Sequence, residues 1–237
     1  MRKILISGAN RGIGKQIAYK ELLEGNQLSV GIRDIDSIYG SKIDPKKWGK
    51  NQIIINKYDA LDENTGKEWI RNTNNIFGGF DTLINCSGVL SKVPFLYKEE
   101  EKKEIKNTMN INFFSVWELC KLSWENLSSS NNGRIITLVS MSGKRSKGNL
   151  ASYSMSKFAL MSLCQTMRNE GWEKGIRVTA ICPGWVNTDM AKEINQFQKK
   201  EMTQPIDIAE ICTNLLALPN SSVPFEIAIN CQLETSN

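Results

Sequence analysis

The sequence predicts an α/β fold, a doubly wound parallel sheet of seven strands with helices on both faces, formed by a single domain over residues 1–237. Three observations support this prediction. Short, continuously apolar runs alternate with longer stretches of helical periodicity, which is typical of parallel strands covered on both faces. A glycine-rich turn directly follows the first apolar run. No stretch rich in proline, glycine or serine divides the chain, so nothing in it marks a second domain.

The elements follow one another along the whole chain. The first strand is expected at residues 3–7 (KILIS), and apolar residues then recur at helical spacing from Gly12 to Glu24, with Gly25 as a C-terminal stop. Six further apolar runs predict strands at residues 28–32, 52–56, 81–86, 134–140, 177–182 and 225–230. Helical stretches separate most of them, most clearly at residues 99–127, 153–170 and 205–217. The segment from Tyr39 to Lys50 has no clear assignment.

Composition excludes several classes of function. Apolar residues make up 41% and charged residues 23% of the chain, which is ordinary for a soluble globular protein. The net charge of +5 comes from scattered basic residues, so nucleic-acid binding has little support. No apolar run reaches the roughly 18 residues that span a bilayer. The N-terminal run in MRKILISGAN is too short for a signal peptide and predicts a buried strand instead.

The chain contains six cysteines and no histidine. The cysteines are far apart, without a C-x-x-C pair, so we expect no metal site and interpret the thiols as small buried hydrophobes in a reducing, cytoplasmic setting. The absence of histidine excludes nucleophile systems that use a Ser-His or Cys-His pair. Any acid/base chemistry therefore falls to Tyr, Lys, Asp, Glu or Cys.

A glycine-rich turn, SGANRGIG (7–14), joins the first predicted strand to the first helix. Glycine suits places where the backbone turns sharply, approaches a pyrophosphate, or packs helix against strand. The free N–H groups and positive end of the following helix attract phosphate. A tight turn without a ligand is the alternative. The turn predicts a dinucleotide site whose expected contacts are Gly8, Ala9, Asn10, Arg11, Gly12, Ile13 and Gly14.

The end of the second strand bears on the choice of dinucleotide. A fold that prefers NAD usually has an acidic residue here for the ribose 2′-hydroxyl, whereas this chain has Arg33. With Arg11 in the glycine turn, two guanidinium groups would favour a 2′-phosphate. The sequence therefore favours NADP(H) over NAD(H). Asp34 follows immediately and is the competing interpretation.

Several motifs, in order and across nearly the whole chain, resemble the short-chain dehydrogenase/reductase family of Rossmann-fold enzymes. SGANRGIG resembles the family's glycine turn with Ser7 in place of the usual Thr, and TLINCSG (82–88) resembles its N-N-A-G stretch with Cys86 and Ser87 as departures. PGWVNTDM (183–190) is similar to the segment that closes over the nicotinamide. The remaining matches are Asn112 in MNINFFSV, Ser140 at the end of RIITLVS, and Tyr153 and Lys157 in YSMSK, thirteen residues further on.

The resemblance implies a mechanism. Tyr153 would be the acid in carbonyl reduction and the base in alcohol oxidation, with its phenol pKa, ordinarily about 10, lowered by Lys157 and by an oxidised nicotinamide. Lys157 would also hold the nicotinamide ribose, and Ser140 would donate a hydrogen bond to the substrate oxygen. Asn112 would hold a water that links Lys157 to solvent, with Asn110 as the alternative. Further cofactor contacts implied by the resemblance are Asp59, Ala60, Asn85, Gly88, Pro183, Gly184, Val186 and Thr188.

The segment 99–127 carries more apolar residues than one sheet face needs, and the family uses this helix and the Tyr153 helix as a subunit interface. A homodimer or homotetramer is therefore expected, with an entirely intramolecular core as the alternative. The run KEEEKKE (98–104) predicts a solvated helix start.

The substrate is less defined than the cofactor. Position suggests Ser142, Lys144, Leu90 and Trp185 as pocket residues, with 189–204 as a modest lid. The basic residues within 144–147 would either receive an anionic substrate or remain solvated. The sequence therefore predicts an NADP-dependent oxidoreductase for a small carbonyl compound or secondary alcohol, with no nucleic-acid or membrane partner. A 3-oxoacyl reductase and a non-catalytic nucleotide sensor or scaffold are the alternatives.

Overall fold

One seven-stranded parallel sheet forms the centre of the protein, in a computed structural model that describes residues 1–193 and 198–232. Its strands lie in the order β3-β2-β1-β4-β5-β6-β7. Their bounds are β1 Lys3–Ser7, β2 Gln27–Ile32, β3 Ile53–Lys57, β4 Thr82–Asn85, β5 Arg134–Leu138, β6 Arg177–Pro183 and β7 Glu226–Ile229. All seven predicted strands are confirmed, with ends that differ from the prediction by up to two residues.

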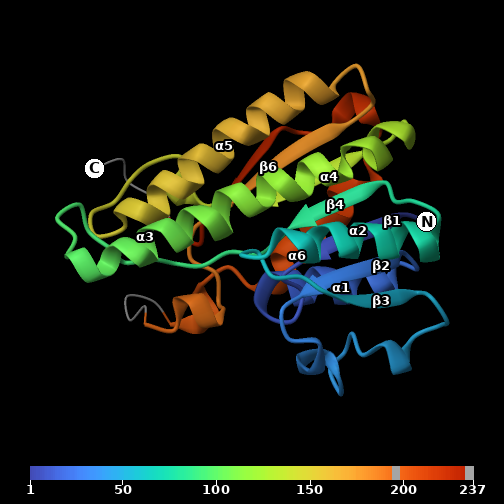
Figure 1. Ribbon diagram of the computed structural model, residues 1–237, viewed down its shortest axis with the longest axis horizontal. Helices are drawn as coiled ribbons and strands as arrows, with labels where there is room; N and C mark the ends of the chain where they lie inside the picture. The colour runs from blue at the N-terminus through green and yellow to red at the C-terminus, as the bar shows by residue number, and fades with distance from the viewer. Residues whose placement is uncertain (194–197, 233–237) are drawn as a thin grey trace.

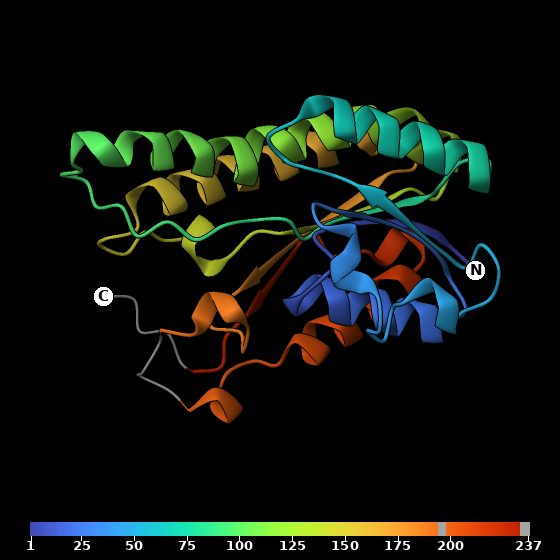
Figure 2. The ribbon, with the colours of Figure 1, turned by 60° about the horizontal axis from the view of Figure 1, so that its bottom comes forward.

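Helices cover both faces of the sheet (Figures 1 and 2). On one face lie α1 (Gly12–Leu23) and α6 (Pro205–Ala217), and on the other lie α2 (Glu63–Phe77), α3 (Lys102–Met109), α4 (Ser115–Ser129) and α5 (Ala151–Gly171). Strand β1 explains why two layers form, because its side chains alternate. Ile4 and Ile6 pack into the core beneath α1 and α6, and Leu5 packs into the core on the opposite face. Burying each of these side chains contributes about 1.5–3 kcal/mol.

The predicted helix 99–127 is made of consecutive segments with different helical hydrogen-bonding patterns. A short 3-10 turn at Glu99–Glu101 leads into α3, and the π-helical segment Asn110–Phe114 separates α3 from α4. The charged start is solvated as predicted, with Lys102 paired to Glu99 at 3.1 Å. A π-helical segment inside a helix changes the direction of the side chains that follow it, and such segments are frequent at functional sites.

Two parts of the fold were not assigned from sequence. Helix α2 presents Trp69, Ile70 and Phe77 to the core along an otherwise polar stretch, so its apolar signal is sparse. The segment 39–50 contains the 3-10 turn Pro45–Lys47, held at its start by the Asp44 side chain, which accepts a hydrogen bond from Lys46 N at 3.0 Å.

The strand order reverses at β1 and β4. Strand β1 pairs with β2 on one side and with β4 on the other, so that Ser7 lies between Gly31 and Asn85. In doubly wound sheets, ligands bind outside the carboxyl ends of the strands at such a reversal. Within the described residues, no helix has the length and apolarity to cross a membrane.

Candidate active site

The glycine turn lies in direct backbone contact with the loop that follows β4. Gly8 has φ +70°, and a Cβ there would lie 2.9 Å from Ser87 N. A Cβ on Gly14 would lie 2.5 Å from the Gly8 carbonyl oxygen, so neither position accepts a side chain without movement of the backbone. The Ser7 hydroxyl accepts hydrogen bonds from Cys86 N at 3.2 Å and Ser87 N at 3.3 Å, which a threonine hydroxyl would also do.

The segment after β6 forms the opposite wall of the site. Thr188 approaches Gly12 so closely that a Cβ on Gly12 would meet its methyl group at 3.4 Å. Between the two walls lies a cavity of about 250 Å³ at the start of α1. The turn at Pro183 and Gly184 is fixed to β7, because Gly184 N donates to Ile229 O at 2.7 Å, and Val186 bridges to Thr203. Bare backbone, a helix N-terminus and basic side chains at this cavity fit the phosphates of a dinucleotide.

The residues expected at the ribose lie beyond the end of β2. Arg33 and Arg11 are both exposed, and within the described residues neither guanidinium makes a hydrogen bond or an ion pair. The Asp34 carboxylate instead accepts a hydrogen bond from Asp36 N at 3.1 Å and so caps the next turn. Asn10 of the glycine turn donates to Ser37 Oγ at 3.3 Å. This geometry leaves the arginines available for an anion and engages the competing acid locally.

Tyr153 and Lys157 lie one turn apart at the start of α5, both buried. The Lys157 ammonium lies 5.8 Å from the centre of the Tyr153 ring and donates a hydrogen bond to Leu138 O at 2.9 Å. Burial lowers the pKa of Lys157 to about 8. Burial also raises the pKa of Tyr153, and the hydrogen bond with the Ser140 side chain acts in the opposite direction. Burial is the larger of these two effects in the protein by itself. The lowering expected with an oxidised nicotinamide beside the phenol stays a prediction.

Ser140 follows β5 and faces Tyr153, with which it shares the hydrogen bond just described. Its hydroxyl also accepts a hydrogen bond from Ser142 N at 3.0 Å, capping the short turn Met141–Gly143. The Ser140 hydroxyl is therefore both the cap of this turn and a hydrogen-bond partner of the tyrosine. The cap fixes the hydroxyl beside the phenol.

Asn112 lies in the π-helical segment and is fully buried, whereas Asn110 is exposed. The Asn112 side-chain oxygen accepts a hydrogen bond from Val89 N, and the Asn112 side-chain amide donates to Val89 O, both at 2.9 Å. The amide also donates to Ser156 Oγ at 3.0 Å, and the Ser156 hydroxyl donates to Tyr153 O at 2.7 Å. Ser156 was not predicted. Its place three residues after Tyr153, on the same helix face, was the available signal.

Gly88 separates the asparagine from the lysine. A Cβ at this position would lie 3.3 Å from the Asn112 side-chain oxygen and 3.7 Å from the Lys157 ammonium. The glycine therefore leaves the space between the two polar groups free of side-chain atoms. Asn85, three residues earlier, is buried in the sheet and donates to Thr137 Oγ1 at 3.2 Å, so its side chain supports the sheet instead of facing the cavity.

The residues suggested for the substrate lie around the mouth of the site. Lys144 is paired with Glu226 at the start of β7, and this hydrogen bond raises the lysine pKa. Trp185 is half-buried, and its carbonyl accepts from Thr203 N at 3.2 Å. Lys92, after β4, pairs with Glu193 of the suggested lid. Residues 194–197 of that lid lie outside the described residues.

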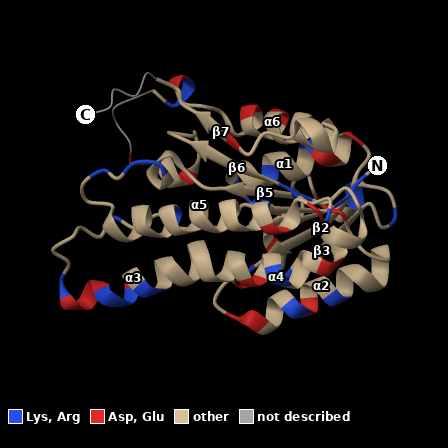
Figure 3. Cartoon of the chain, turned by 90° about the horizontal axis from the view of Figure 1, so that it is seen from above, with Lys and Arg blue, Asp and Glu red and all other residues tan. Residues whose placement is uncertain are grey.

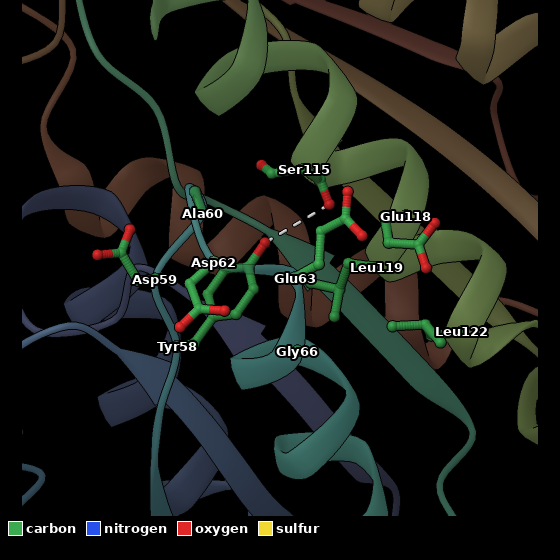
Figure 4. A pocket seen from close by; sticks show the side chains of 10 residues that line it. All are labelled: Tyr58, Asp59, Ala60, Asp62, Glu63, Gly66, Ser115, Glu118, Leu119 and Leu122. Atoms are coloured by element: carbon green, nitrogen blue, oxygen red, sulfur yellow. Dashed lines mark hydrogen bonds between the residues drawn. The ribbon is translucent and has the colours of Figure 1, made fainter.

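Asp59 and Ala60 line a small cavity between α2 and α4 (Figure 4). At about 20 Å³ it has room for about one water molecule and not for a cofactor ring. The Tyr58 phenol donates across it to Ser115 O at 3.5 Å, and burial raises the tyrosine pKa to about 12. The Asp59 carboxylate accepts a hydrogen bond from Leu61 N at 3.0 Å and so caps the loop, and the cofactor contact expected of this residue stays a prediction.

All six cysteines are free. Cys120, Cys164, Cys182 and Cys212 are buried as predicted, but Cys86 and Cys231 are half-buried, because they follow strands and do not lie within the core. Among the described residues, no three His, Cys, Asp or Glu side chains are grouped as metal ligands.

Comparison with known proteins identifies the family. Residues 2–199 match the model of the family described as short chain dehydrogenase. The chain belongs to the short-chain dehydrogenase family. The motif that contains Tyr153 and Lys157 lies within the matched residues.

Two relatives indicate the range of activities. An agropine synthesis reductase of Rhizobium rhizogenes is 32% identical over 235 residues, which are 98% of this chain and 53% of that protein. The chain thus spans about half the length of that relative. A 3-oxoacyl-[acyl-carrier-protein] reductase of Buchnera aphidicola is 30% identical over 209 residues, 88% of this chain and 83% of that protein.

A solved structure shows the same fold. The alcohol dehydrogenase of the archaeon Thermococcus sibiricus, complexed with 5-hydroxy-NADP, superposes with a TM-score of 0.84. It shares 24% sequence identity with this chain, and the match covers 97% of this chain and 96% of that one. The doubly wound architecture predicted from the sequence is confirmed.

Proposed function

We propose that this protein is an NADP-dependent oxidoreductase that transfers a hydride between the nicotinamide and a small carbonyl compound or secondary alcohol. The observation that carries the proposal is the convergence of Ser140, Tyr153 and Lys157 at the carboxyl edge of the sheet, beside the glycine turn. Residues 1–237 then form a single nucleotide-binding domain.

The cofactor would supply or accept the hydride, and the chain would move the proton. Tyr153 donates its phenolic proton to the carbonyl oxygen during reduction, and Ser140 orients that oxygen by a hydrogen bond. Lys157, held by Leu138 O, stabilises the phenolate that remains. Asn112 and Gly88 border the path by which a water would return a proton to Lys157.

NADP(H) is preferred because Arg33, after β2, and Arg11, in the glycine turn, are both available, whereas Asp34 is engaged as a cap. Titration of the purified protein with NADPH and NADH, followed by the fluorescence of the reduced nicotinamide, tests this preference. Arg33→Asp is expected to weaken NADPH binding by about tenfold or more and to leave NADH binding nearly unchanged. Arg71→Asp, an equal charge change on an exposed position of α2, is the control. Equal losses for both nucleotides with Arg33→Asp would refute the 2′-phosphate contact.

The substrate is proposed to be small and without an obligatory anionic group, because Lys144 is already paired with Glu226. A 3-oxoacyl reductase is the second candidate, favoured by the name of the Buchnera aphidicola relative and by the basic residues at 144–147. Consumption of NADPH with small ketones, and with acetoacetyl thioesters of coenzyme A and of acyl carrier protein, separates the two. Faster turnover of the carrier-protein thioester than of every small ketone would favour the second candidate.

A non-catalytic sensor is disfavoured by the intact set of Asn112, Ser140, Tyr153 and Lys157.

Helices α4 and α5 are proposed to form a homodimer or homotetramer interface. Phe114, at the start of α4, is 53% exposed, and Phe158, on α5, is 43% exposed. Figure 3 shows the charges of α3 gathered at its start, while α5 carries few. Free thiols fit a reducing, cytoplasmic location.

A further inference from the structure

The cavity at the start of α1 has one wall that the glycine turn does not provide. Gly12 lines one side, and Asn187, Thr188, Asp189, Lys192 and Lys199 line the other, enclosing about 250 Å³. The glycine side offers backbone and the positive end of a 12-residue helix. The opposite side offers two lysine side chains, which no motif in the sequence had marked.

Cations outnumber anions at this cavity. Asp189 is the carboxylate among the lining residues, and Lys192 pairs with it at 2.9 Å. The charges of Lys192, Arg11 and Lys199 all act to lower the pKa of Asp189, with the Lys192 hydrogen bond as the largest cause. Within the described part of the chain, Lys199 makes no ion pair of its own. Two lysines and one carboxylate therefore line the cavity, and Arg11 lies near enough for its charge to act on that carboxylate.

The backbone of Lys199 is held in place by a chain of hydrogen bonds. Gln204 donates from its side chain to Lys199 O at 3.0 Å, and its side-chain oxygen accepts from Asn187 Nδ2 at 2.9 Å. Asn187 N also donates to Thr203 O at 2.9 Å. These hydrogen bonds tie the backbone at Lys199 to the residues that follow β6 and line the cavity.

We propose that Lys192 and Lys199 bind the diphosphate of the nicotinamide dinucleotide from the side opposite the glycine turn, an inference that rests on the function proposed above. The diphosphate carries two negative charges and occurs in NADH and NADPH alike. Compact lysine ammonium groups suit phosphate oxygens as point charges, and the free N–H groups of α1 supply the directional contacts. These lysines therefore determine affinity for both dinucleotides, whereas Arg33 determines the choice between them.

Charge reversal at adjacent positions tests the assignment. Lys199→Glu and Lys200→Glu change the net charge equally, but Lys200 does not line the cavity. Both variants are titrated with NADPH and with NADH by nicotinamide fluorescence, and inorganic pyrophosphate is used as a competitor. Lys199→Glu is expected to raise the dissociation constants of both nucleotides about tenfold and to weaken pyrophosphate competition, whereas Lys200→Glu changes each less than about twofold. Thermal unfolding without nucleotide should be the same for both variants.

The other outcomes contradict the proposal. Equal losses in the two variants would mean a general effect of surface charge, and a loss restricted to NADPH would mean a 2′-phosphate contact. Unchanged binding by Lys199→Glu, while the natural protein binds NADPH, would refute the diphosphate contact and leave the proposed function standing. Failure of the natural protein to bind either nucleotide would refute the proposed function itself.

Discussion

Replacing Lys157 with methionine is predicted to stabilise the protein near neutral pH. The lysine is 5% exposed, and burial lowers its pKa from 10.5 to about 8. That fall corresponds to about 3 kcal/mol by which the folded state disfavours the ammonium. Methionine keeps an unbranched chain without the charge, but it gives up the hydrogen bond to Leu138 O, worth about 1 kcal/mol. The expected net gain in the free energy of unfolding is about 2 kcal/mol.

The gain depends on pH with a definite sign. The unfolded chain holds the lysine proton up to about pH 10.5, whereas the folded chain releases it at about pH 8. The natural protein therefore gains stability from this group as the pH rises through that interval, and the variant does not. The advantage of Lys157→Met should be greatest near neutral pH and should disappear by about pH 10.

Urea unfolding at neutral pH and near pH 10 measures this difference. Lys121→Met is the control, because that side chain is 71% exposed and its removal should give no pH-dependent change. The reasoning would be refuted if Lys157→Met were less stable than the natural protein near neutral pH, or if the difference were the same at both pH values. Stability gained with loss of activity is the usual pattern for a buried functional charge.

Two further substitutions test the packing of the site. Gly14→Ala should lower the free energy of unfolding by about 2 kcal/mol or more and weaken NADPH binding, because its Cβ would lie 2.5 Å from a backbone oxygen. Gly148→Ala is the control, since no atom lies within 4 Å of its Cβ, and it should be neutral or slightly stabilising in thermal unfolding. Equal effects of the two would contradict the close contact of the glycine turn. Ser156→Ala should lower the free energy of unfolding in urea by about 1–3 kcal/mol, because the buried Asn112 amide would lose the Ser156 hydroxyl as its acceptor. Ser154→Ala should change this free energy little, since the Ser154 hydroxyl has no partner among the described residues. A Ser154→Ala loss as large as that of Ser156→Ala would contradict the assigned hydrogen bond.

The sequence was sufficient for the strands and for the order of the motifs. A run such as KILIS is apolar at its three central positions. In a covered parallel sheet both faces need apolar side chains, so the pattern leaves little choice. The spacing between Ser140 and Tyr153 could likewise be read directly. Helix α2 was harder to predict, because its few large apolar side chains, Trp69, Ile70 and Phe77, lie along a mostly polar stretch.

The details of the site depend on contacts that no local pattern carries. The π-helical segment that carries Asn112 lies between α3 and α4 and contacts α5, an arrangement that no local pattern predicts. The partnership of Lys144 with Glu226 joins positions 82 residues apart in the chain. The effect of burial on the pKa values of Tyr153 and Lys157 depends on the surrounding core, which no local sequence pattern shows.

The central claim is that Tyr153 moves the proton in an NADPH-dependent reduction. The most direct test compares the natural protein with Tyr153→Phe on the small ketone or thioester that it reduces fastest, with NADPH binding measured in parallel. The account predicts that turnover falls by about a hundredfold or more while NADPH affinity stays within about twofold. A phenylalanine variant that retains most of the turnover, under conditions where hydride transfer limits the rate, would contradict it.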